Sequence, residues 1–286
     1  MPEQVVESAI IEGEFKANDG VVLRYVEAGQ GAPLVLVHGW SHSGKLFAEQ
    51  LKGLSGRYRV IAIDLRGHGT SGKAKHGMRL SRLAKDLHEF FVALDLHDVT
   101  VLGHGMGAAV LWNYWDMFGR DRIAKMIFVD MSPFATANPI MSDEERKLAG
   151  TTFDLKNLYS EVNAMAGING GAVSEALTKS MVSRQTPRET IRAIVTQDLK
   201  TPRDLAAALL YNWATHDWRD TIPRIDVPVL AIGAKGSPVP YESQLWISEQ
   251  IPGAQAVIFE ANEGGSHFMF IENPVKFNDA VAAFAG

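Results

Sequence analysis

The sequence contains no cysteine, which excludes disulfide bonds, thiolate metal sites and a cysteine nucleophile. It also lacks any cluster of lysine and arginine, and its net charge is -5. Nucleic acids and anionic membranes attract clustered basic side chains, so we expect neither as a partner. No apolar run approaches the roughly 20 residues that a membrane helix needs.

The N-terminal stretch, residues 1–9, lacks the pattern of a signal peptide, because it is acidic and polar rather than basic and then apolar. We therefore expect a cytoplasmic protein. Hydrophobic residues make up 46% of the 286 residues and charged residues 21%, so the chain has enough apolar material for a sizeable core. Whether it is a monomer or a homodimer stays open.

Short apolar runs alternate with longer segments of helical pattern. The runs predict strands, and the longer segments predict helices over 80–94, 106–118, 241–250 and 275–285. Strands that alternate with helices form a mostly parallel sheet with helices on both faces, which is an α/β fold. The apolar runs predict strands over 33–37, 59–63, 99–102, 126–129, 229–232 and 256–259. Two further strands, 12–16 and 21–27, are predicted because they flank Asn18-Asp19-Gly20, the turn signal of a hairpin.

Residues 134–222 interrupt this alternation, since they contain no strand-like run. Thr186 and Thr201 each precede a proline and have an acid three residues later, which predicts two helix starts capped by threonine. We expect a helical cap, or lid, inserted over 134–222 into a core domain made of 1–133 and 223–286. The insertion is too long for a loop without structure.

The strongest motif is Gly103-His104-Gly105-Met106-Gly107, between a predicted strand and a predicted helix. It has the spacing of the G-x-S-x-G nucleophile elbow, with glycine in the place of serine. The nucleophile of such an elbow has a strained backbone, which glycine adopts without steric cost. We therefore expect the fold to persist without the nucleophile. A looser dinucleotide-binding motif, which would end at Ala108, is the less favoured interpretation.

Three further motifs occur in a fixed order along the chain: Leu36-Val-His-Gly-Trp40, Asp64-Leu-Arg-Gly-His-Gly-Thr-Ser71 and Gly264-Gly-Ser-His-Phe268. Together with the elbow, they make nearly the whole chain resemble the α/β-hydrolase superfamily. The resemblance implies the α/β-hydrolase fold, with a central, mostly parallel sheet and a helical lid.

The resemblance also implies the roles of several site residues. His267 would be the general base, since imidazole titrates near neutral pH. The oxyanion hole would consist of the backbone N–H groups of Trp40 and Met106. We expect the histidines of the other motifs to hold the backbone by hydrogen bonds; they are His38, His68 and His104.

The acid of the site is ambiguous. The family usually places it after the strand that follows the insertion, but here Gly236 or Ser237 stands there. Asp130, after the preceding strand, gives the required order of nucleophile, acid and histidine, so we favour it as the partner of His267. An aspartate that only caps its turn remains the alternative. Asp226 and Glu242 are weaker candidates.

Several aromatic and polar side chains are candidates for substrate binding, although a place in the core is an alternative for each. No two histidines with a carboxylate have the spacing of a metal site on a helix, so we expect neither a metal nor a cofactor. The candidates are Trp40, His42, Phe134, Trp213 and Trp218.

These residues predict a hydrolase of a carboxylic ester or lactone, built for a Ser-His-Asp triad but present as a nucleophile-less, inactive form. We expect Gly105, His267 and Asp130 to mark the triad positions, and an apolar or aromatic small molecule to bind there. Either glycine has replaced a native serine or a natural relative lost it, and the otherwise intact site favours replacement. Alternatives are a cofactor-free dioxygenase that uses the His–Asp pair and a non-catalytic small-molecule receptor.

Overall fold

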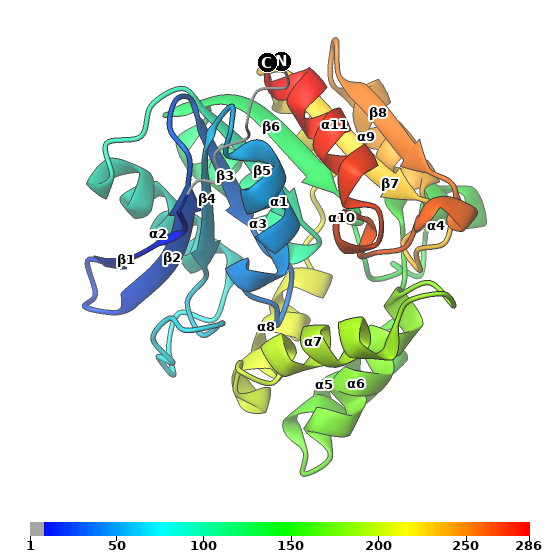
Figure 1. Ribbon diagram of the computed structural model, residues 1–286. Helices are drawn as coiled ribbons and strands as arrows, with labels where there is room; N and C mark the ends of the chain where they lie inside the picture. Colours follow the sequence, from blue (N-terminus) through cyan, green and yellow to red (C-terminus); the bar gives the residue numbers. More distant parts are fainter. Residues whose placement is uncertain (1–8) are drawn as a thin grey trace.

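The computed structural model describes residues 9–286, so most of the acidic N-terminal stretch lies outside the described residues (Figure 1). Eight strands form one sheet in the order β1-β2-β4-β3-β5-β6-β7-β8. They are β1 (Ile11–Lys16), β2 (Val22–Ala28), β3 (Pro33–Val37), β4 (Arg59–Asp64), β5 (Val99–His104), β6 (Ile123–Val129), β7 (Val229–Ala234) and β8 (Gln255–Phe259).

The six strands from β4 to β8 in the sheet order are parallel to one another, whereas β1 and β2 add an antiparallel edge. The chain runs from β3 outward to β4 and then returns to place β5 on the other side of β3. Ligands of open parallel sheets bind where the strand order reverses, beyond the carboxyl ends of the strands. In this sheet the reversal lies between β3 and β5.

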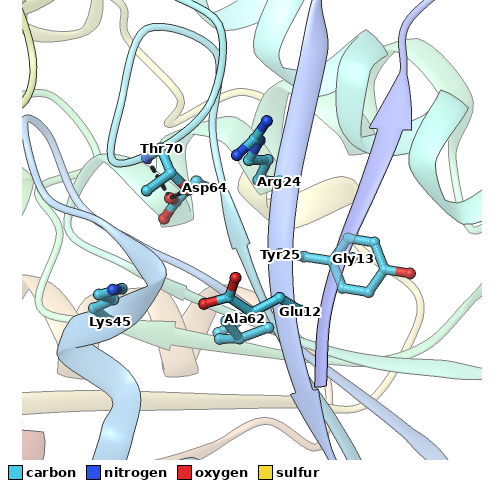
Figure 2. A pocket seen from close by; sticks show the side chains of 9 residues that line it. Glu12, Gly13, Arg24, Tyr25, Lys45, Ala62, Asp64 and Thr70 are labelled. Atoms are coloured by element: carbon cyan, nitrogen blue, oxygen red, sulfur yellow. Dashed lines mark hydrogen bonds between the residues drawn. The ribbon is translucent and has the colours of Figure 1, made fainter. Parts of the chain in front are cut away.

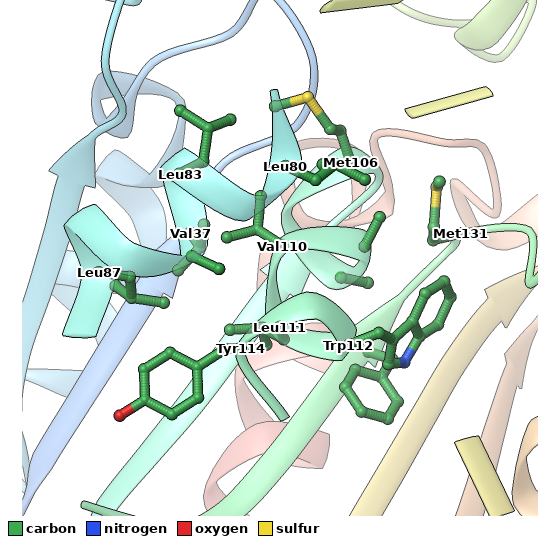
Figure 3. Packing of buried hydrophobic residues seen from close by; sticks show 14 of the residues in the cluster. Val37, Leu80, Leu83, Leu87, Met106, Val110, Leu111, Trp112, Tyr114 and Met131 are labelled. Atoms are coloured by element: carbon green, nitrogen blue, oxygen red, sulfur yellow. The ribbon is translucent and has the colours of Figure 1, made fainter. Parts of the chain in front are cut away.

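Alternate residues of the central strands face opposite sides of the sheet, and each side is covered by helices. On one side Val35, Val37 and Val101 pack with α2 (Leu80–Ala93), α3 (Met106–Phe118) and α9 (Glu242–Gln250). Figure 3 shows part of this core, where Leu83 and Val110 lie close to the strand residue Val37. On the other side the strands pack with α1 (Ala48–Leu54), α10 (Met269–Glu272) and α11 (Pro274–Ala285).

Five helices stand between β6 and β7: α4 (Asp143–Ala149), α5 (Leu155–Ala166), α6 (Gly170–Met181), α7 (Arg188–Asp198) and α8 (Arg203–Ala214). Figure 1 shows α5 to α8, coloured green to yellow, at one end of the sheet. The first of the five, α4, packs instead beside α9, where Lys147 Nζ lies 3.0 Å from Glu242 Oε1.

The two threonine caps expected in the insertion are wrong. Pro187 and Pro202 are the residues that precede the first turns of α7 and α8, and neither has a side-chain cap. The hydroxyl of Thr186 instead donates to Glu272, and that of Thr201 donates to the backbone oxygen of Ser41. The two threonine hydroxyls therefore bind residues far away in the sequence and not the N–H groups of the first helical turns.

The predicted α/β class and the mostly parallel sheet are confirmed. Every predicted strand and core helix is present, with ends that move by a few residues. The pattern missed α1 and the one-turn helix α10. Among residues 9–286 we find no helix that combines the length and the apolar character needed to cross a membrane.

Candidate active site

A cavity of about 190 Å³ lies at the carboxyl ends of the strands, between the sheet and the helical insertion. The loops after β3, β5, β6, β7 and β8 all contribute to its wall, and the rest comes from α5 to α8 and the segment between α4 and α5. Its lining is mainly apolar. The lining residues include Trp40, Gly105, Met106, Asp130, Met131, Phe153, Leu177, Met181, Leu210, Trp213, Val239 and His267.

The turn after β4 has a structural role outside this cavity, at a small polar hollow beside the β1–β2 edge (Figure 2). Asp64 Oδ2 accepts hydrogen bonds from the backbone N–H and the hydroxyl of Thr70, at 2.6 and 2.9 Å. Its Oδ1 accepts from the N–H of Gly44 at 2.7 Å. The Asp64–Ser71 motif therefore fixes this turn against the loop after β3 and supplies no residue to the cavity wall.

The elbow between β5 and α3 has the backbone expected of a nucleophile position. Gly105 has φ 51° and ψ -126°, a conformation that side-chain-bearing residues adopt only under strain. The glycines on either side allow close contact: a Cβ at Gly103 would lie 2.5 Å from the Ala108 nitrogen, and a Cβ at Gly107 would lie 2.3 Å from the Val37 oxygen. These two positions require glycine because rigid backbone faces them.

We predict that Gly107→Ala destabilises the protein by about 3 kcal/mol, since the added methyl meets the backbone of β3. The control is Gly56→Ala, because a Cβ at Gly56 meets nothing within 4 Å. Urea unfolding measures both variants, and the control should change the free energy of unfolding by less than about 0.5 kcal/mol. Equal stability of the two variants would refute this close approach.

The structure brings His267 and Asp130 together from the segments that follow β8 and β6. His267 Nδ1 donates to Asp130 Oδ2 at 2.7 Å, and the Asp130 side chain is fully buried. The hydroxyl of Ser237 donates to the same oxygen at 2.5 Å. Ser237 occupies the place where the family usually has its acid, so here that position supports Asp130 instead of replacing it. Asp226 is exposed, and Glu242 pairs with Lys147.

The other ring nitrogen of His267 faces the elbow. A Cβ built at Gly105 would lie 3.3 Å from His267 Nε2 and 3.7 Å from the Cα of Gly39. No protein group among the described residues shares a hydrogen bond with His267 Nε2. A hydroxyl on that Cβ would therefore stand beside a nitrogen able to accept its proton, since Nδ1 holds its own proton toward Asp130.

Two backbone N–H groups belong to residues next to Gly105 and Gly39, which meet at this point. Met106 is the first residue of α3, and the first N–H groups of a helix have no partner within it. Trp40 follows Gly39, which is adjacent to the elbow. Within residues 9–286, neither of these amides donates a hydrogen bond to protein. They remain available for an oxygen that develops negative charge, as in an oxyanion hole.

Three of the five predicted binding side chains line the cavity: Trp40, His42 and Trp213. The structure does not place the other two among the described residues that line it. Phe134 lies under the Arg219 guanidinium, and Trp218 is buried against Trp112 and stacks on His216. They come from the first and the last part of the insertion, which meet where the Trp218 N–H donates to the Pro133 oxygen at 2.9 Å.

The remaining motif histidines hold backbone groups, as their positions in turns indicate. His38 Nδ1 donates to the Gly39 oxygen, while its Nε2 accepts from the N–H of Leu65. His104 Nε2 donates to the backbone oxygen of His267 at 2.9 Å. Burial lowers the pKa of His38 and His104, so both rings are neutral at physiological pH.

Sequence reasoning missed Asp198, a carboxylate at the end of α7 that lines the cavity. Its Oδ2 accepts from the Thr178 hydroxyl at 2.8 Å, and its Oδ1 lies 3.4 Å from His42 Nε2. Burial raises the pKa of Asp198 to about 7. No local motif marks this residue, because its partners come from distant parts of the chain.

We predict that Asp198→Asn stabilises the protein at high pH only. The unfolded chain loses the Asp198 proton near pH 3.8, whereas the folded protein holds it until about pH 7. The ionisation of Asp198 therefore does not reduce the free energy of unfolding below pH 4, and it reduces it progressively as the pH rises from 4 to 7. Relative to the unaltered chain, the variant should gain ~2–4 kcal/mol between pH 5 and pH 8.

Urea unfolding at both pH values measures this difference. Asp226→Asn is the control, because Asp226 is exposed and its loss should leave the pH dependence unchanged. The comparison with the unaltered chain is needed because buried histidines act in the opposite direction below pH 6.5. A difference between Asp198→Asn and the unaltered chain that is constant with pH would contradict the raised pKa.

The sheet, the elbow after β5, the buried His–Asp pair and the two free amides define a hydrolase scaffold of the α/β type. Comparisons with known proteins agree with this class. The family model described as the alpha/beta hydrolase fold matches residues 32–274. The chain therefore belongs to the α/β-hydrolase fold family.

Individual relatives differ in their chemistry. The non-heme chloroperoxidase CPO-A1 of Kitasatospora aureofaciens is 28% identical over 256 residues, which cover 86% of this chain and 90% of the relative. A bromoperoxidase from Bacillus anthracis has a TM-score of 0.87 at 24% identity, covering 96% of this chain and 99% of its own. An esterase from Rhodococcus sp. ECU1013 has a TM-score of 0.80 at 25% identity, covering 96% and 98%.

Proposed function

We propose that this chain is the scaffold of a carboxylic-ester or lactone hydrolase in which glycine occupies the place of the nucleophilic serine. The observation that carries the proposal is the position of Gly105, whose Cβ site lies 3.3 Å from His267 Nε2. The proposal is also supported by Asp130, the buried partner of His267, and by the free amides of Trp40 and Met106. The likeness to an esterase from Rhodococcus is consistent with it.

With a serine at position 105, each group would have a defined role. The serine oxygen would attack the carbonyl carbon while its proton moves to His267 Nε2, and Asp130 would stabilise the resulting imidazolium. The amides of Trp40 and Met106 would bind the oxyanion. Collapse of the intermediate would break the C–O bond, with the alcohol oxygen taking the proton from His267. Water would then release the acyl group by the reverse of these transfers.

The chain as it stands would bind such a substrate with very little turnover, because the loss of a triad serine costs about six orders of magnitude in kcat. A cavity of about 190 Å³ has room for a ligand the size of an aromatic ring, since benzene occupies an apolar cavity of about 150 Å³ in another protein. The walls formed by Trp40, Phe153 and Trp213 favour an apolar or aromatic substrate.

The helical insertion would act as a lid. Residues of α5 to α8 form the part of the cavity wall that faces away from the sheet, so the size and polarity of the substrate would depend on them. The proposed cap spans 134–222, and the proposed core consists of 1–133 and 223–286. Within the cap, α4 packs beside α9 of the core. Lids of this kind exclude water from the reaction.

One observation favours a second function. Without a serine at 105, His267 Nε2 faces the cavity with no protein partner among the described residues, while Asp130 holds the ring. A dyad of this kind can take a proton directly from an acidic heteroaromatic hydroxyl, which is the first step of the cofactor-free dioxygenases of this fold. That activity would not require the serine.

The test compares the unaltered chain with Gly105→Ser on nitrophenyl esters and lactones, with dissolved oxygen followed in parallel on a hydroxyquinolone. Hydrolysis that appears only in the variant would support the ester or lactone hydrolase. Oxygen uptake by the unaltered chain would support the dioxygenase instead. Binding with neither activity in either protein would leave a small-molecule receptor.

A further inference from the structure

The oxyanion loop, which we define as residues 40–43 after β3, is fastened to one corner of the helical insertion. This corner, residues 197–206, joins the end of α7 to the start of α8. Every residue of the loop has a polar contact with this corner. Trp40 Nε1 donates to the Ala206 oxygen at 2.7 Å, and Ser41 Oγ donates to the Asp198 oxygen at 3.0 Å. Ser43 Oγ donates to Gln197 Oε1 at 2.9 Å, and His42 Nε2 lies 3.4 Å from Asp198 Oδ1.

Ser41 has the most hydrogen bonds of the loop to the α7–α8 corner. Its backbone has φ +64°, a left-handed conformation that a serine adopts only where neighbouring groups impose it, and it is fully buried. The corner supplies those groups: Arg203 Nη2 donates to Ser41 Oγ at 2.8 Å, and the Thr201 hydroxyl donates to the Ser41 oxygen at 3.4 Å.

Arg203 connects the corner internally. Besides Ser41, its guanidinium donates to the backbone oxygens of Asp198 and Thr201 and to the Ser174 hydroxyl in α6. A single side chain thus ties α6, the end of α7 and the start of α8 to the loop. Arg203 is absent from the cavity wall formed by the described residues, so it does not contact a substrate held there.

We propose that Arg203 is a positioning residue for the oxyanion hole: through Ser41, the α7–α8 corner fixes the amide of Trp40 where the oxyanion forms. The proposal rests on the proposed function of the site. It makes the insertion part of the catalytic apparatus as well as a cover over the cavity. Preorganised donors stabilise a transition state only when their geometry is fixed before the reaction.

The kinetic test uses the Gly105→Ser background, with Arg203→Met as the variant. A misplaced donor weakens the transition state more than the bound substrate, so we expect kcat to fall about 10- to 100-fold with little change in KM. The control is Arg192→Met, which removes an exposed arginine of α7 and should leave both constants unchanged. A fall in kcat that is equal in both variants would overturn the proposal.

A double-mutant cycle tests whether Arg203 acts through Ser41. Ser41→Ala removes the hydroxyl that Arg203 binds, so by itself it should lower kcat by about tenfold. Adding Arg203→Met to it should then cost less than Arg203→Met alone, because the two residues belong to one network. Fully additive effects would contradict this route. Ser41→Ala also keeps the proposal testable where Arg203→Met does not fold.

Hydrogen exchange separates this proposal from the proposed function, because it requires no activity. In the unaltered glycine chain, Arg203→Met should speed amide exchange in a peptide covering residues 38–46, which includes the hydrogen-bonded N–H groups of His42 in the loop and of Gly44 just after it. Arg192→Met should not. Unchanged exchange in Arg203→Met would overturn the proposal, whether or not Gly105→Ser hydrolyses esters.

Discussion

Gly105→Ser is expected to raise the rate of ester or lactone cleavage by at least ~10³-fold, and by as much as ~10⁶-fold with a well-matched substrate. The reason is geometric. The Cβ of the new side chain would lie 3.3 Å from His267 Nε2, while Asp130 already holds the opposite ring nitrogen at 2.7 Å. We therefore expect the substitution to complete the proposed proton-transfer path.

The backbone also favours this result. Gly105 already has φ 51° and ψ -126°, the strained conformation of an elbow nucleophile, so the chain does not have to rearrange to present a hydroxyl. The imidazole of His267 has to move by a few tenths of an ångström, because 3.3 Å is slightly closer than ordinary van der Waals contact. The serine should destabilise the fold by about 1–3 kcal/mol through its backbone strain.

The matched control is Gly105→Ala. It introduces the same Cβ and the same strain without a hydroxyl, so it should show the loss of stability without the gain in rate. The measurement is kcat/KM on a panel of nitrophenyl esters and lactones for the three proteins. An equal rate for alanine and serine at position 105 would show that the triad geometry is not the source of the activity.

The second large effect concerns the acid of the site. In the Gly105→Ser background, Asp130→Asn is expected to lower kcat by about 10⁴-fold. An asparagine fits the left-handed backbone of Asp130, which has φ +52°, so the fold should remain. When the NH2 group of the asparagine faces His267, it donates to Nδ1, and the imidazole then holds its proton on Nε2 and cannot accept the serine proton there.

Two further substitutions calibrate that result. Ser237→Ala removes one hydrogen bond to Asp130 Oδ2 and should cost about tenfold or less, since the carboxylate still holds His267. Glu242→Gln changes a carboxylate that pairs with Lys147 on the surface and should cost nothing. If Asp130→Asn and Ser237→Ala were equally mild, Asp130 would only cap its turn, and the histidine would act alone.

Much of the fold was predictable because its signals are local. Apolar or β-branched residues fill the runs 33–37, 99–102, 126–129 and 229–232, which became parts of β3, β5, β6 and β7, as expected for strands covered on both faces. The motifs at Gly103–Gly107 and around His267 were likewise recognisable, because each is a short stretch of consecutive residues. Elimination favours Asp130, since residues 235–241 directly after β7 contain no carboxylate, and the structure places Asp130 Oδ2 2.7 Å from His267 Nδ1.

The cap side of the site was not predictable, because its contacts join residues far apart in the sequence. Asp198 and His42 lie in different elements, 156 positions apart, and neither belongs to a motif that links them. The Thr201-Pro202 pattern predicts a helix cap, yet the hydroxyl of Thr201 donates to the backbone oxygen of Ser41. Trp218 looked like a candidate for the cavity, yet it packs on Trp112 in the core. Both residues lie outside the helices, where no periodicity indicates which neighbours a side chain contacts.

We propose that position 105 is a nucleophile site in all respects except its side chain. The most direct measurement is the intact mass of Gly105→Ser after treatment with an aryl fluorophosphonate, which forms a covalent bond with a serine that a histidine activates. We predict one phosphonyl adduct per chain, mapped to residue 105, with none on the unaltered chain or on Gly105→Ala. Adducts of equal yield on all three proteins, or no adduct on Gly105→Ser, would contradict the claim.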